Sequence, residues 1–128
     1  MRKLMLIIGI LLIAGTANAK HLHPEKYYQD LWCADRGQVE VRQEDGTRVD
    51  CLTECMAVEF DFCGKWYESI TQALHYGMLT GKQAAIVLIV EKPGDWKYVE
   101  RAKALIKFYC LPVVVFVTTP KGIIQSGY

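Results

Sequence analysis

The spacing of apolar residues divides the chain after residue 26 into helical and strand-like stretches. Apolar positions recur every three or four residues in three of them, which predicts helices over 27–36, 65–80 and 96–110. Five others show alternating polar and apolar positions or a continuous apolar run, which predicts strands over 38–42, 47–53, 57–62, 84–91 and 112–118. Asp45-Gly46 separates the first two strands and predicts a hairpin turn.

The order of these elements, α-β-β-β-α-β-α-β, indicates the fold class. A hairpin and a third strand come first, and helices then connect the later strands, which favours parallel pairing there. Gly37 and Gly81 are placed to end the first and second helices. We therefore expect one α/β domain, a sandwich with a mixed central sheet of four or five strands.

Alternation along the second and third strands assigns their side chains to faces. In the second strand we expect one face with Val49, Cys51 and Thr53, and the other with Arg48, Asp50 and Leu52. In the third strand we expect Val58, Phe60 and Phe62 on the apolar face and Glu59 and Asp61 opposite. The hairpin and a short link make the strands neighbours, so Asp50 and Glu59 should share a face of the sheet.

The first nineteen residues have the pattern of a secretory signal peptide. Arg2 and Lys3 precede an uncharged apolar run over residues 4–15, and Ala17-Asn18-Ala19 has the A-x-A form of a cleavage site. The run is short for a membrane span, so an uncleaved anchor is the less favoured alternative. We expect cleavage after Ala19, export to the periplasm or out of the cell, and a mature domain of residues 20–128.

Charge and cysteine content refine this picture. The chain has 15 basic and 14 acidic residues, and two of the basic ones, Arg2 and Lys3, lie in the leader, so the mature domain has a formal charge of −1. This balance argues against a strong nonspecific grip on nucleic acid, although a local basic patch stays open. An exported domain with five cysteines should form at least one disulfide and leave one thiol over. The pairing does not follow from spacing, and Cys51 is alternatively a buried free thiol.

The acidic residues of the second and third strands are the strongest candidates for chemistry. Two carboxylates on neighbouring strands, Asp50 and Glu59, have the ligand type that Mg²⁺ or Mn²⁺ prefers, and Asp61 adds a third. Lys65 follows at the start of the second helix, where an ammonium group can help to activate water. Metal-assisted hydrolysis of phosphodiesters needs such a set.

Beside these residues, the helix carries Gln72 and Tyr76 as Gln-x-x-x-Tyr, with Ser69 and Lys65 along the same edge. The element order and this motif resemble the PD-(D/E)XK, or restriction-endonuclease-like, nuclease superfamily, in a variant similar to RecB-type nucleases. The resemblance covers about residues 27–90. It implies that Asp50 and Glu59 bind Mg²⁺ or Mn²⁺ and that the substrate is DNA or RNA.

The resemblance also implies roles for the remaining residues. Lys65 and Gln72 would orient water or phosphate, and Tyr76 and Ser69 would contact the substrate. One departure is clear: the third strand of the family has acid-x-lysine, whereas this chain has Glu59-Phe60-Asp61, so an aspartate stands at the lysine position. Lys65 would then have to reach back from the helix.

The alternative is a catalytically inactive exported module on the same fold that binds a protein or nucleic acid. In that case Glu59 and Asp61 would be a solvated strand face, and exposed aromatic residues such as Tyr67 or Trp96 would form the contact surface. Histidines carry less weight: we expect His21 and His23 to lie in a solvated tail, and His75 to be a surface or packing residue.

Overall fold

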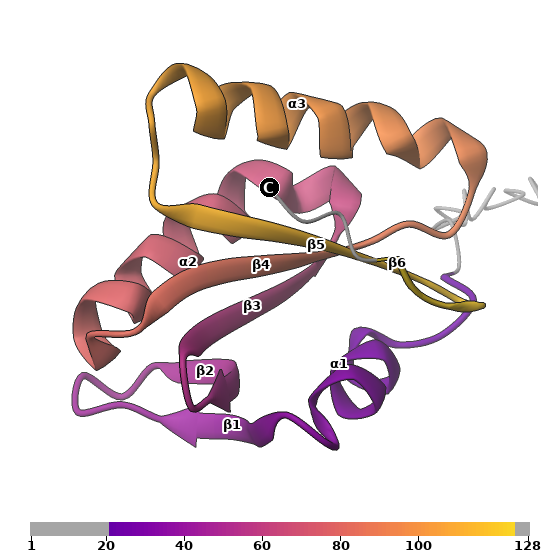
Figure 1. Cartoon of the computed structure of the whole chain (residues 1–128). Coiled ribbons are helices and arrows are strands. Elements are labelled where there is room, and N and C mark those ends of the chain that lie inside the picture. Colours follow the sequence, from indigo (N-terminus) through magenta and orange to yellow (C-terminus); the bar gives the residue numbers. More distant parts are fainter. Residues whose placement is uncertain (1–20, 125–128) are drawn as a thin grey trace, which may run out of the picture.

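A mixed sheet of six strands forms the middle layer of the domain (Figure 1). The structure is a computed structural model that describes residues 21–124; the predicted signal peptide lies outside this part. The strands follow one another across the sheet in chain order: β1 (Gly37–Arg42), β2 (Arg48–Thr53), β3 (Met56–Phe62), β4 (Gln83–Ile89), β5 (Val113–Thr119) and β6 (Gly122–Ile124). The first three are antiparallel neighbours, β3 to β5 are parallel, and β6 returns antiparallel to β5.

Helices cover both faces of this sheet in the described part of the chain. They are α1 (Glu25–Cys33), α2 (Trp66–Thr80) and α3 (Trp96–Phe108), and 3-10 turns η1 (Cys63–Lys65) and η2 (Pro93–Asp95) lead into the last two. Figure 1 shows α1 on one side of the sheet and α2 and α3 on the other. A crossover helix joins each pair of parallel strands, as the sequence predicts.

Each face of the sheet has its own apolar core. Trp32 of α1 packs with Phe60 of β3 and Val87 of β4, whereas Ile86 and Leu88 of β4 pack under α2 and α3. Residues 84–90 are buried throughout, which explains their uninterrupted apolar sequence. Within residues 21–124, no helix combines the length and the apolar character that a membrane crossing requires.

The predicted α/β class and mixed sheet are confirmed, and the differences are local. The sequence predicts at most five strands, because the sixth has three residues and shows no alternation of its own. The first helix begins at Glu25 and ends at Cys33. Gly37 does not end it but begins β1, where a Cβ would lie 2.2 Å from the carbonyl oxygen of Leu52. Gly81 does end α2, with a left-handed φ of 67°.

The predicted alternation along β2 is wrong at one point. Cys51 lies in the cluster with Trp32, as expected, but Val49 packs with Ala57 and Tyr76 on the other side. The pairing of β2 with β1 is interrupted here, between Val39–Cys51 and Val41–Val49, where Glu40 has a positive φ of 55°. A change of face between these residues follows from that break in the ladder.

The expected solvated tail is also wrong for its two histidines. His21 stacks on Phe62 with ring centroids 3.5 Å apart, and its Nδ1 lies 2.8 Å from Oε2 of Glu91. His23 stacks on Tyr27 at 4.0 Å. His75 is a surface residue with a structural partner, since its Nε2 lies 2.8 Å from Oδ2 of Asp45 in the hairpin turn.

Candidate functional site

Asp50 and Glu59 meet where β2 pairs with β3. The antiparallel register pairs Cys51 with Val58 and Leu52 with Ala57, which brings Asp50 opposite Glu59. Asp50 Oδ2 accepts a hydrogen bond of 2.8 Å from the Phe60 N–H, which fixes its carboxylate between the two strands. The predicted placement on adjacent strands is confirmed, and the two carboxyl groups are close enough to share a hydrogen bond.

The acidic face of β3 is buried. Glu59 is 6% exposed and Asp61 is 5% exposed, so these residues are not the solvated strand face of the alternative interpretation. Glu59 Oε2 is a buried atom without a hydrogen-bond partner in the described structure. A buried carboxyl oxygen in this state is costly unless a proton or a cation compensates it.

The electrostatics of the pair follow from this burial. Burial, and then the charge of Asp50, raise the pKa of Glu59 to about 10, so Glu59 keeps a proton at neutral pH and donates it to Asp50. Burial also raises the pKa of Asp50. The pKa of Asp61 rises to about 6 because of burial, although the Lys65 ammonium opposes the shift. Burial is the largest common cause, and repulsion between neighbouring carboxylates adds to it at Glu59 and Asp61.

Asp50, Glu59 and Asp61 form a carboxylate cluster with a fourth acid, Glu25, which the sequence reasoning missed. It is the first residue of α1, and its side chain donates a hydrogen bond to Asp61. Burial, and then the charges of Asp61 and Asp50, raise its pKa to about 7. The predicted helix began at residue 27 and left Glu25 in a loose tail; Pro24 before it was the available signal, because proline is common at helix starts.

Gln29, one turn further along α1, is a second residue that the sequence did not indicate. Its Nε2 donates to the backbone oxygen of Asp50 at 2.7 Å and to Oε1 of Glu40 at 3.0 Å. A disulfide between Cys33 of α1 and Cys51, the residue after Asp50, joins the same two elements. Helix α1 is therefore held to β2 directly beside the site.

Lys65 lies at the rim of the cluster. It ends the turn η1 and, as predicted, reaches back toward the strand, with Nζ 3.9 Å from Oδ1 of Asp61. Its side chain is 61% exposed, so the ion pair itself contributes little to stability. Ser69 is fully buried and donates to the Lys65 carbonyl at 3.1 Å and to Oδ2 of Asp61 at 3.5 Å.

The two residues of the Gln-x-x-x-Tyr motif have different environments. Tyr76 is buried near the pair, and burial followed by the charges of Glu59 and Asp50 raises its pKa to about 12. Gln72 is exposed, and among the described residues no hydrogen bond joins it to the cluster. Ser69 and Tyr76 form part of the wall of the cluster, so their contact with a substrate stays a prediction.

The sequence predicts a metal site at Asp50, Glu59 and Asp61, which are members of this carboxylate cluster. Among residues 21–124, no group of three or more His, Cys, Asp or Glu side chains has an arrangement that could hold a metal ion. Asp61 lies against Lys65, Ser69 and Glu25, and its charge also acts on Glu59, so its predicted part in a metal site stays a prediction. Asp50 and Glu59 lie together, and Glu59 Oε2 has no hydrogen-bond partner among the described residues. Carboxylate oxygens are the ligand type that Mg²⁺ prefers, so the binding of a cation by this pair stays a prediction.

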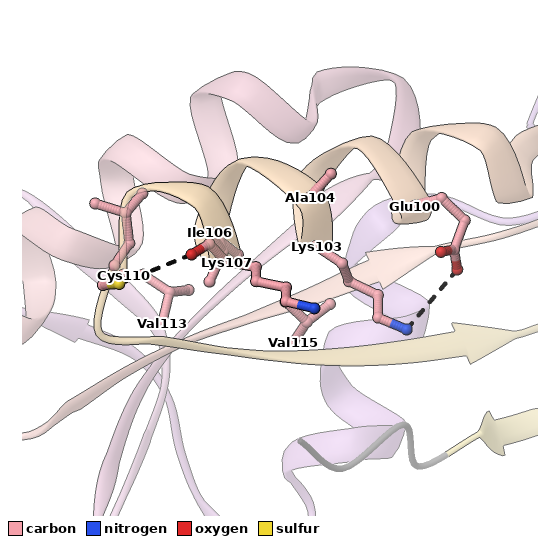
Figure 2. A pocket seen from close by; sticks show the side chains of 9 residues that line it. Glu100, Lys103, Ala104, Ile106, Lys107, Cys110, Val113 and Val115 are labelled. Carbon is pink, nitrogen blue, oxygen red and sulfur yellow. Dashed lines mark hydrogen bonds and ion pairs between the residues drawn. The ribbon is translucent and has the colours of Figure 1, made fainter.

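A hollow on another part of the surface lies away from these acids. It has a volume of about 680 Å³ between α3 and β5, and Figure 2 shows Lys103 and Lys107 extending along it while Lys103 pairs with Glu100. It contains none of the cluster carboxylates, so its size does not make it the centre of the chemistry. Comparisons with models of known families, with curated proteins and with solved structures found no match.

Proposed function

We propose that the carboxylate cluster is the centre of a Mg²⁺- or Mn²⁺-dependent hydrolysis of phosphodiester bonds in DNA or RNA. The observation that supports it best is the buried, unpartnered Oε2 of Glu59 beside Asp50. A purely structural acid of this depth normally has a cation or donors matched to it. A cluster that instead retains a proton is suited to exchange that proton for a divalent ion.

The residues divide into three roles in this proposal. Asp50, Glu59 and the Phe60 carbonyl hold the ion, which, when bound, polarises a phosphoryl oxygen and lowers the pKa of bound water. Lys65, exposed at the rim with its ammonium near Asp61, binds the phosphate or takes part in orienting water. Asp61, Ser69 and Glu25 position Lys65 through hydrogen bonds and charge.

The restriction-endonuclease-like core and export belong to the same proposal. The order of helices and strands, with the acids on β2 and β3 and the lysine at the start of α2, supports the core. The Cys33–Cys51 disulfide supports export, because disulfides persist in oxidising compartments.

The proposal is tested with the purified mature domain and labelled single-stranded and linear double-stranded DNA and RNA. We expect cleavage with Mg²⁺ or Mn²⁺, none with chelator, and a loss of at least a hundredfold in Glu59→Gln and Lys65→Ala. Glu54→Gln, which changes an exposed acid in the turn before β3, is the matched control and should cleave normally.

Equal cleavage in the wild type and in both variants would show that the activity comes from a contaminant or another site. Absence of cleavage both with and without metal would favour the catalytically inactive binding module. Its contact surface would then be sought at Tyr67, which is 66% exposed, or Trp96.

A further inference from the structure

A second hollow, of about 420 Å³, opens where the parallel strands β3 and β4 end. Phe62 and Ile89, the last residues of these strands, form its floor with Tyr98 of α3, and Lys65 and Lys92 stand in its wall. Lys65 belongs to this strand-end hollow and to the carboxylate cluster alike. Ligands of open α/β sheets bind in this position, outside the carboxyl ends of parallel strands.

The acids of the strand-end hollow already have partners. Glu91 accepts hydrogen bonds from the Tyr28 hydroxyl at 2.9 Å and the Leu22 N–H at 3.0 Å, and it lies against His21. These bonds lower the pKa of Glu91 although burial would raise it. Asp95 Oδ2 accepts from the backbone N–H groups of Glu91 and Lys92. Both carboxylates are therefore occupied by groups of the chain itself.

The cations around the hollow are exposed, by contrast. Lys97 Nζ lies 4.9 Å from the centroid of the Tyr98 ring, and Arg101 Cζ lies 5.6 Å from it. Lys97 and Arg101 thus flank this half-buried ring, while Lys65 and Lys92 line the hollow to which the ring also belongs; all four cations are exposed. This is a local basic patch in a mature domain whose formal charge is −1.

We propose that the strand-end hollow binds a segment of single-stranded nucleic acid and leads its backbone to the carboxylate cluster. An aromatic ring flanked by cations stacks an unpaired base and neutralises the adjoining phosphates. A duplex hides the faces of its bases and is much larger than a 420 Å³ hollow. The inference rests on the proposed function for the choice of nucleic acid over other polyanions.

Binding is measured without catalysis, by fluorescence anisotropy of a labelled twelve-nucleotide single strand and a duplex of the same length, both with chelator present. The wild type should bind the single strand more tightly. Tyr98→Leu should weaken single-strand binding about tenfold, while Tyr98→Phe keeps the ring and should bind normally. Lys92→Gln, Lys97→Gln and Arg101→Gln should each weaken binding and make its salt dependence shallower.

Lys107→Gln is the matched control, because it removes a charge from an exposed position of α3 that neither lines the strand-end hollow nor lies against the Tyr98 ring. Equal losses in Lys107→Gln and in the three patch variants would overturn the inference, as would unchanged binding in Tyr98→Leu. Patch-dependent binding without any cleavage would uphold the subsite and refute the proposed hydrolysis. Cleavage by a protein whose binding is unchanged in the patch variants would refute the subsite and uphold the proposed hydrolysis.

Discussion

Removing the disulfide between α1 and β2 should destabilise the domain by an amount that depends on the length of the loop that it closes. Cys33 and Cys51 are 18 residues apart, and both are fully buried. For a closed loop of that length, the lost chain entropy of the unfolded state corresponds to about 3 kcal/mol at 25 °C. A domain of this size has an unfolding free energy of about 5–15 kcal/mol, so the loss is a large share.

The double variant Cys33→Ala/Cys51→Ala isolates this effect, because alanine leaves no hydroxyl in the core where serine would. Urea denaturation without reductant should give an unfolding free energy lower by about 3 kcal/mol, and a melting temperature lower by more than about 10 °C. Cys110→Ala, at an exposed free cysteine, should change it by less than about 0.5 kcal/mol.

Reductant supplies an independent check on the same quantity. It should lower the stability of the wild type to nearly that of the double variant and leave the double variant unchanged. Equal stability of the wild type and the double variant without reductant would refute the entropic reasoning. A loss of site function with retained folding would locate the role of the disulfide in holding Gln29 against Asp50 and Glu25 against Asp61.

Three further predictions concern the cluster and the sheet. Because the pKa of Glu25 rises from 4.5 to about 7 on folding, the folded state binds more protons, so the stability that Glu25 contributes without metal should be lost between pH 4.5 and 7. Glu25→Gln should make the fall of stability with pH less steep in this range, in urea titrations at several pH values. Calorimetric Mg²⁺ or Mn²⁺ titration in buffers of different ionisation enthalpy should show proton release in the wild type and none in Glu59→Gln; no difference would contradict the protonated state of Glu59. Gly37→Ala should cost about 1–3 kcal/mol because its Cβ meets the Leu52 carbonyl, whereas Gly64→Ala, with nothing within 4 Å, should be nearly neutral.

The sequence predicts those parts of the fold that depend on neighbours along the chain. The Asp45-Gly46 turn has glycine at a φ of 87°, and the alternation over β3 separates Phe60 from Glu59 and Asp61 as expected. Both signals are local and periodic. A disulfide was expected as well, but which cysteines pair depends on how α1 lies on the sheet. The alternative that Cys51 is a free thiol is wrong, because Cys51 pairs with Cys33.

The parts that the sequence could not predict depend on contacts between distant segments. Glu25 joins the cluster only because α1 begins next to β3, and His21 packs only because Phe62 and Glu91, far along the chain, lie together at the strand ends. Val49 lies on the unexpected face beside the interruption of the β1–β2 pairing at Glu40, which no periodicity reveals. The burial of Glu59 also required the position of α2 over the sheet.

The charge balance of the cluster bears on whether it is structural or functional. Buried acids that only stabilise a fold are normally matched by cations or several donors. Here Glu25, Asp50, Glu59 and Asp61 converge, and the cation that an ion pair of the described structure places against them is Lys65, largely exposed and 3.9 Å from Asp61. Lys65 reaches Asp61 from the turn before α2, which is the contact that the proposed role of Lys65 requires. The remaining negative charge is balanced by protons on Glu59 and Glu25 in the metal-free state, and a divalent ion would balance it better. We propose that a bound cation is the reason for an arrangement that destabilises its own ionised form at neutral pH.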